Sequence, residues 1–196
     1  MRTYRPVNLN PLWFLIALNV VIFIVTLISG PYPIRIDNPV VVLLGLHTED
    51  FLHQPWTIIT NLFVHGSFGH IICNMVSLYF LGRFLIQLVG AKRFLIVYFL
   101  GGLVGNILFI LLEPYSIGIG ASGAIFALGG MLVMIAPGLR VIIIPIPVPV
   151  PLWMAMAIFL LISFLGSGIA WQAHLGGLLL GLIAGYRFKK KRVYFY

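Results

Sequence analysis

Long apolar stretches alternate with short connections that contain polar residues, glycine or proline along the whole chain. An α-helix needs about 20 mostly apolar residues to cross the hydrocarbon core of a bilayer. Six stretches approach this pattern, so we predict an all-α membrane protein, a six-transmembrane-helix bundle in a single domain over residues 1–196. The spans are expected at about residues 12–29, 66–87, 92–112, 121–136, 152–165 and 171–188.

The first apolar stretch also has the basic flank of a signal peptide. Its roughly 18 residues exceed the usual apolar core of a signal peptide, which is about 7–15 residues long. Pro31, Tyr32 and Pro33 follow it, rather than a small-residue cleavage site. We therefore interpret residues 12–29 as the first membrane helix.

Two connections differ from the rest. Residues 31–64 form the longest polar interval but include apolar residues such as Val40, Phe51 and Ile58, so we expect a partly ordered loop at the membrane interface. Residues 145–151 alternate proline with aliphatic residues. This pattern excludes a helix and predicts a stiff connector.

Composition supports a membrane protein and excludes several other classes. Hydrophobic residues make up 61% of the chain and charged residues 8%, with a mean hydropathy of +1.11, whereas soluble domains carry about 25% charged residues. A net charge of +8 would suggest a nucleic-acid partner for a soluble protein, but the apolar stretches exclude that interpretation. The single cysteine, Cys73, excludes a disulfide framework and a cysteine-based zinc site.

The six-span arrangement places most basic residues on one side of the membrane and all the acidic residues on the other. With six spans, the side shared by both termini holds eleven of the twelve basic residues, including Arg2, Arg5 and the tail at 187–192. The positive-inside rule then places the N- and C-termini in the cytoplasm, and the basic tail is suited to contact anionic membrane lipid. The lack of a leader favours a prokaryotic plasma membrane. The opposite side holds Arg35 and the four acids Asp37, Glu49, Asp50 and Glu113.

Four polar side chains stand out inside the predicted spans, where such groups are costly and indicate function. They are His70 and Asn74 on the second span, Ser122 on the fourth and His174 on the sixth. At about 1.5 Å per residue, His70, Ser122 and His174 all lie roughly 20 Å above the cytoplasmic ends of their helices. His70 and Asn74 are four residues apart and point the same way.

The fourth span is too short to cross the membrane alone. Its residues reach roughly 24 Å, against a hydrocarbon core of about 30 Å. Residues 113–120 must therefore enter the bilayer as irregular backbone. Ser122 then lies at a helix N-terminus, where free N–H groups favour negative charge, and Gly118, Gly120 and Gly123 leave the backbone open to close approach.

A serine in this position becomes a nucleophile only when a base takes its proton. His174 lies at the right depth, whereas the acids lie on outer loops and only Glu113 comes near. We therefore expect a Ser–His dyad rather than a triad. Donors to a developing oxyanion would be His70, the Asn74 amide and the backbone N–H of Ser122 or Gly123.

Three motifs, in this order, resemble the rhomboid family of intramembrane serine proteases. They are His65-Gly-Ser-Phe-Gly-His70-Ile-Ile-Cys-Asn74, Gly120-Ala-Ser122-Gly123 and Ala173-His174-Leu-Gly-Gly177-Leu-Leu-Leu-Gly181. The resemblance covers essentially the whole chain and corresponds to the minimal six-helix form. It implies a short central fourth helix and a membrane-embedded first loop over residues 31–64.

The resemblance also implies roles for individual residues. Ser122 would be the nucleophile, His174 the general base, and His70 with Asn74 the oxyanion-hole donors. Gly177 and Gly181 are expected to bring the sixth helix against the fourth. The full set of supporting residues is His65, Gly120, Phe126, Gly177, Gly181 and Trp56.

Two positions depart from the family pattern. Thr57 stands where the family has the arginine of a Trp-Arg pair, next to Trp56. Phe126 stands where many relatives have tyrosine, so we expect it to stack on His174 without a hydroxyl. The second substitution should spare catalysis.

Other interpretations of the same residues remain open. Ser122 alone would fit a small packing residue, His174 a satisfied interior histidine, and His70 with Asn74 a hydrogen-bonded pair between helices. For the whole chain, the alternatives are a small membrane transporter and a catalytically inactive rhomboid-like binder of membrane proteins. A metal-dependent protease fits less well, because His65 and His70 are five residues apart with no Glu between them.

The sequence thus predicts a serine endopeptidase that cleaves transmembrane segments of membrane proteins near the extracytoplasmic side. We expect transmembrane proteins and lipid as partners, and neither nucleic acid, metal nor cofactor. The oligomeric state is left open.

Overall fold

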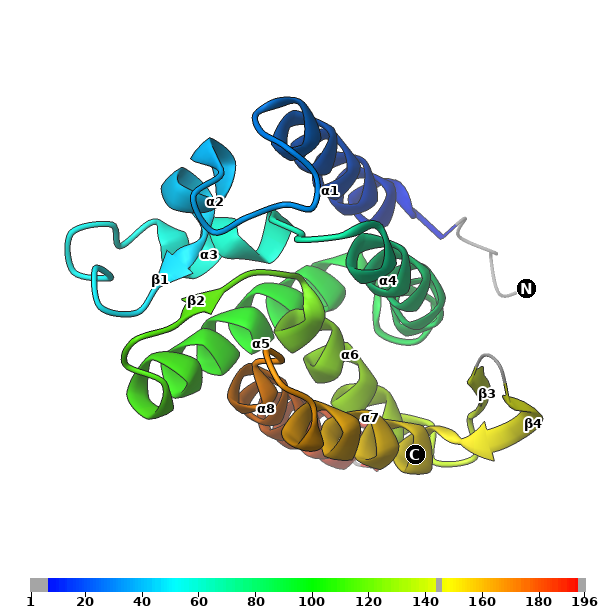
Figure 1. Ribbon diagram of the computed structural model, residues 1–196. Helices are drawn as coiled ribbons and strands as arrows, with labels where there is room; N and C mark the ends of the chain where they lie inside the picture. Colours follow the sequence, from blue (N-terminus) through cyan, green and yellow to red (C-terminus); the bar gives the residue numbers. More distant parts are fainter. Residues whose placement is uncertain (1–6, 144–145, 194–196) are drawn as a thin grey trace.

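A computed structural model describes residues 7–143 and 146–193. Helices dominate it, and one of them lies at each of the six expected spans (Figure 1). The last continues to Val193, past the expected end at residue 188. The six long helices are α1 (Asn10–Ile28), α4 (Phe68–Val89), α5 (Ala91–Leu112), α6 (Ser122–Ile135), α7 (Leu152–Leu165) and α8 (Trp171–Val193).

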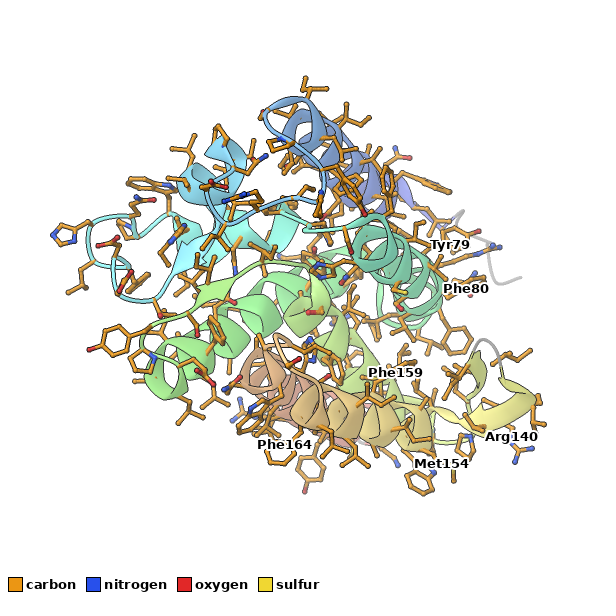
Figure 2. All side chains as sticks on the ribbon, in the orientation of Figure 1. Tyr79, Phe80, Arg140, Met154, Phe159 and Phe164 are labelled. Carbon is orange, nitrogen blue, oxygen red and sulfur yellow. The ribbon has the colours of Figure 1, made fainter. Side chains whose placement is uncertain are left out.

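Three helices of the described chain, α1, α4 and α5, are long and apolar enough to cross a membrane. The helices α6 and α7 are apolar too but have only 14 residues each. Large apolar side chains cover the outside of the bundle: Phe80 is 65% exposed and Phe164 60% (Figure 2). Soluble monomers rarely expose large contiguous apolar surface, so these features describe a helical membrane protein.

Helix α6 forms the centre of the bundle. It packs against α4, α5, α7 and α8, and every residue from Gly123 to Leu132 is buried. A helix that is apolar on all sides needs such an environment. The residue at its N-terminus, Ser122, is therefore placed inside the protein and is surrounded by other helices.

The start of α4 is set by a serine cap. The sequence predicts a start at about residue 66, whereas the helix begins at Phe68. The backbone of Ser67 is extended, and its hydroxyl oxygen accepts a 3.1 Å hydrogen bond from the backbone N–H of His70. This cap fixes the first turn of the helix that carries His70 and Asn74.

The first loop contains more regular structure than the sequence pattern predicts. Residues 31–64 include α2 (Pro39–Leu44), β1 (Leu46–His47), α3 (Thr57–Thr60) and a short 3₁₀ helix, Asn61–Phe63. The strand β1 pairs antiparallel with β2 (Ile117–Gly118), which precedes α6. Thr48 extends the pairing, because its N–H donates to Ser116 O at 3.0 Å. The loop thereby holds the irregular segment that leads to Ser122.

The proline-rich stretch connects α6 to α7 without a helix in its described residues, as predicted, and it also forms a strand, which was not predicted. Residues Ile146–Pro151 form β4, which pairs antiparallel with β3 (Arg140–Ile143). Proline lacks an N–H, but successive residues of a strand turn their N–H groups to opposite sides. Because proline occupies every second position, the remaining N–H groups all face one side, as an edge strand allows.

Candidate active site

Ser122 and His174 come together from two helices. Ser122 begins α6, and His174 lies one turn into α8. The two side chains meet in a 2.6 Å hydrogen bond between Ser122 Oγ and His174 Nε2. They are 52 positions apart in the sequence, and the packing of α8 on α6 creates this contact.

Glycines allow the two helices to approach this closely. A Cβ on Gly177 would collide with the carbonyl oxygen of Gly123, and one on Gly181 with that of Ala127. Helix α5 packs closely as well, since a Cβ on Gly105 would lie 2.5 Å from Ala173 O. The small residues of α8 thus fix the height and distance of His174 relative to Ser122.

Two further contacts hold the His174 ring, one on its face and one at Nδ1. The ring of Phe126 stacks on it, with centroids 4.4 Å apart and an interplanar angle of 12°. Nδ1 lies 2.8 Å from Ser163 Oγ on α7. All four acids lie in the described part of the chain, and none of them hydrogen-bonds this ring; Glu113 accepts instead from Gln172 Nε2 at 2.7 Å.

His70 and Asn74 lie on the same face of α4, and His70 faces the loop before Ser122. A Cβ on Gly120 would lie 2.6 Å from His70 Nε2, and Gly120 has a φ of +115°, which suits glycine. The Asn74 amide nitrogen donates to His70 O at 2.8 Å. His65 is fully buried, with its ring edge-on to His70 at a centroid distance of 4.8 Å.

A pair of asparagines outside the three sequence motifs supports the same loop. Asn61 and Asn106 exchange side-chain hydrogen bonds of 3.2 and 2.8 Å, and Asn61 O accepts from Gly120 N at 2.9 Å. Both residues line a cavity of about 10 Å³ that borders Ser122 and Gly123. One water molecule needs about this much room.

Trp56 and Thr57 lie in the first loop, away from α6 and α8. The Trp56 indole N–H donates to Leu43 O at 3.0 Å, which ties α3 to the end of α2. Thr57 is buried, and its hydroxyl donates to Gln54 O at 2.6 Å. The loop is anchored here by local backbone contacts.

The histidines and acids of the site do not form a metal-binding cluster. Over residues 7–143 and 146–193, no three His, Cys, Asp or Glu side chains gather closely enough to hold a metal ion. The arrangement brings together a hydroxyl, an imidazole and a helix N-terminus with free N–H groups.

The sequence is similar to known proteins. A family model described as "Rhomboid domain" matches residues 52–191. "Putative rhomboid protease YdcA" of Bacillus subtilis is 34% identical over 138 residues, which cover 70% of this chain and 69% of the relative. "Rhomboid protease GluP" of the same organism is 28% identical over 179 residues, 88% of this chain and 33% of the relative. "Inactive RHOMBOID-like protein 8" of Arabidopsis thaliana is 33% identical over 85 residues, 43% of this chain and 24% of the relative.

Proposed function

The chain belongs to the rhomboid family of intramembrane serine proteases, and on this basis we propose that it is a serine endopeptidase acting on transmembrane segments of membrane proteins. The 2.6 Å hydrogen bond between Ser122 Oγ and His174 Nε2 carries the proposal. A hydroxyl and a base at this separation form an activated nucleophile. Ser122 acts as the nucleophile and His174 as the general base.

The reaction proceeds through an acyl-enzyme. Ser122 Oγ attacks the scissile carbonyl carbon while its proton passes to His174 Nε2, and this proton then moves to the nitrogen that leaves as the C–N bond breaks. A water molecule, with His174 again as base, hydrolyses the resulting ester. The cavity beside Ser122 and Gly123 has room for such a water.

Several N–H groups support an oxyanion hole. The backbone N–H groups of Ser122 and Gly123 lie in the first turn of α6, where they lack helical acceptors. In the long 3.5 Å contact between Gly66 N and His70 Nδ1, the backbone can only donate. A neutral His70 ring that accepts at Nδ1 carries its proton on Nε2, on the side that faces Gly120. Asn74 keeps one amide hydrogen after its bond to His70 O.

Loss of either side-chain donor is expected to slow the reaction. The substitutions His70→Ala and Asn74→Ala should each lower kcat for a single-span reporter by about 10²-fold, with a smaller change in KM, because the oxyanion forms only along the reaction. The control is His53→Ala, since His53 is an exposed first-loop residue and its loss should leave kcat unchanged. Wild-type kcat in both His70→Ala and Asn74→Ala would contradict the oxyanion assignment.

We further propose one domain with six spans and both termini in the cytoplasm. The first turn of α5 and the C-terminal part of α8 lie together, since the Arg93 guanidinium is 5.2 Å from the Phe188 ring centroid. This proximity agrees with one basic side of the membrane. Arg2, Arg5 and the side chains at 190–192 lie outside the described residues. A prokaryotic plasma membrane, with lipid around the apolar outer surface, fits this orientation.

Cleavage then takes place near the extracytoplasmic side. Ser122 lies at the end of α6 opposite the β3–β4 hairpin, next to the segment that β1 holds (Figure 1). A substrate helix must unwind locally there, because helical hydrogen bonds shield its peptide bonds. The first loop and α7 border the site and are the elements that can open to admit it.

The test uses purified protein in detergent and a reporter with one transmembrane segment. Cleavage within or beside the outer part of that segment, insensitive to EDTA, is the expected result, and mass spectrometry of the fragments gives the position. An EDTA-sensitive cleavage would contradict the serine mechanism. Binding of the reporter without cleavage would favour the second candidate, an inactive membrane-protein binder, which the similarity to a relative named inactive brings into consideration.

A further inference from the structure

A third side chain, Ser163 on α7, contacts the ring of His174 on the side away from Ser122. Ser163 is 4% exposed. Its hydroxyl oxygen lies 2.8 Å from His174 Nδ1 and 2.6 Å from the carbonyl oxygen of Phe159, one turn earlier in the same helix. Together with the contact to Ser122, both ring nitrogens of His174 have a hydroxyl partner.

The shorter of the two contacts of Ser163 determines where its proton lies. Two oxygens 2.6 Å apart repel each other unless a proton lies between them, and a carbonyl oxygen carries none. The single hydroxyl proton of Ser163 therefore points to Phe159 O. Its oxygen is left as an acceptor toward His174, so the partner atom Nδ1 must carry a hydrogen.

We propose that Ser163 is a positioning residue that holds neutral His174 in the tautomer protonated on Nδ1. The lone pair of Nε2 is then directed at Ser122 Oγ, as the general base requires. When Nε2 takes the serine proton, Ser163 Oγ continues to accept from Nδ1–H of the charged ring. The neutral hydroxyl thereby takes over the orienting role that a carboxylate has in a Ser-His-Asp triad.

The helix that carries Ser163 is distinct from those of the two reacting residues. Ser122 lies on α6 and His174 on α8, whereas the neighbours of Ser163 on α7, Phe159 and Phe164, lie on the outer surface (Figure 2). Ser163 is thus the inward polar group of a helix whose other face is apolar. The Phe126 ring holds the plane of the imidazole, and Ser163 selects which nitrogen is protonated.

The matched pair Ser163→Thr and Ser163→Val tests this role. Threonine keeps a hydroxyl that bonds back to the carbonyl four residues earlier, while valine has nearly the same shape without it. We expect Ser163→Thr to retain kcat within about twofold, and Ser163→Val to lose about tenfold in kcat with KM nearly unchanged, which is what a hydrogen bond to a charged group contributes. Equal kcat for the two variants would contradict the proposal.

The kinetic experiment rests on the proposed protease function, because it measures cleavage. A spectroscopic measurement tests the role of Ser163 without requiring cleavage. The ¹⁵N spectrum of histidine-labelled protein, with His174 assigned by comparison with His174→Gln, reports which ring nitrogen is protonated. We expect Nδ1–H in wild type and Ser163→Thr, and a shift toward Nε2–H in Ser163→Val. Protonation of Nε2 in neutral His174 of the wild type would overturn the proposal, whether or not the reporter is cleaved. Absent cleavage with Nδ1–H intact would count against the protease function alone.

Discussion

Alanine in place of Ser122 is expected to lower kcat/KM for a single-span reporter by about 10⁴-fold or more. The substitution removes the oxygen that forms the covalent bond, and the hydrogen bond to His174 Nε2 disappears with it. When two residues act as one nucleophilic unit, the effects of their substitutions on the rate are strongly non-additive. His174→Ala should therefore be nearly as damaging, and the double variant little worse than either single one. Quantitative gel or fluorescence assays of reporter cleavage measure all three.

Matched substitutions outside the site control for general damage. Ser77→Ala is also a helical serine-to-alanine change, on α4, and His53→Ala lies in the first loop. Both should retain activity within about twofold, as surface or peripheral changes usually do. Activity near the wild-type level in either Ser122→Ala or His174→Ala would refute the dyad.

A single methyl group at Gly177 is expected to disrupt the site without touching either reacting residue. Its Cβ would collide with the carbonyl oxygen of Gly123 and lie 2.8 Å from the carbonyl carbon, so α8 must move away from α6. A displacement of about 1 Å at a reacting group costs about 10²-fold in rate, and overpacking destabilises by about 1–3 kcal/mol. Gly177→Ala should therefore lose at least about 10²-fold in kcat/KM and unfold at a lower temperature in detergent.

Gly69→Ala is the matched control for this change. Gly69 is also helical, but a Cβ there meets nothing within 4 Å. Its replacement should preserve activity and raise stability slightly, because alanine has the higher helix propensity. If Gly177→Ala behaved like Gly69→Ala in both assays, close packing of α8 on α6 would not be what aligns His174.

Much of the helical organisation can be predicted from the sequence, because hydrophobic periodicity and length dominate in a membrane protein. The short α6 and the irregular segment before it follow from chain length against membrane thickness. The shift of α4 from residue 66 to Phe68 depends on one side-chain cap, that of Ser67. Such a cap depends on the backbone conformation of a single residue, which a hydropathy pattern does not resolve.

The two strand pairs are harder to predict. The β1–β2 pairing joins Leu46 and His47 to residues about 70 positions later through only two residue pairs, and no local pattern encodes such a contact. The β3–β4 hairpin has a period-two signal in its prolines. Proline is a helix breaker in both a connector and a strand, so its presence alone does not separate the two. What separates them is the alternation, which leaves every second N–H group available for pairing.

The residues of the candidate site also differ in how far the sequence alone could predict them. The rule that a polar group inside a span indicates function selected Ser122 and His174, which the structure brings together. Asn106, an amide inside α5 that belongs to none of the three motifs, is not among the predicted site residues, although the same rule applies to it. Ser163 carries no such signal, because a serine in an apolar helix commonly satisfies itself on its own backbone. Only the packing of α7 on α8 brings it to His174.

Covalent labelling of the nucleophile tests the Ser122–His174 dyad most directly. A fluorophosphonate probe forms a covalent bond with a serine that a neighbouring base activates, and peptide mass spectrometry locates the adduct. We expect one adduct, on Ser122, that is absent in Ser122→Ala and forms at least about 10²-fold more slowly in His174→Ala. Labelling of a different serine, or cleavage of the reporter by protein whose Ser122 stays unlabelled, would contradict the dyad.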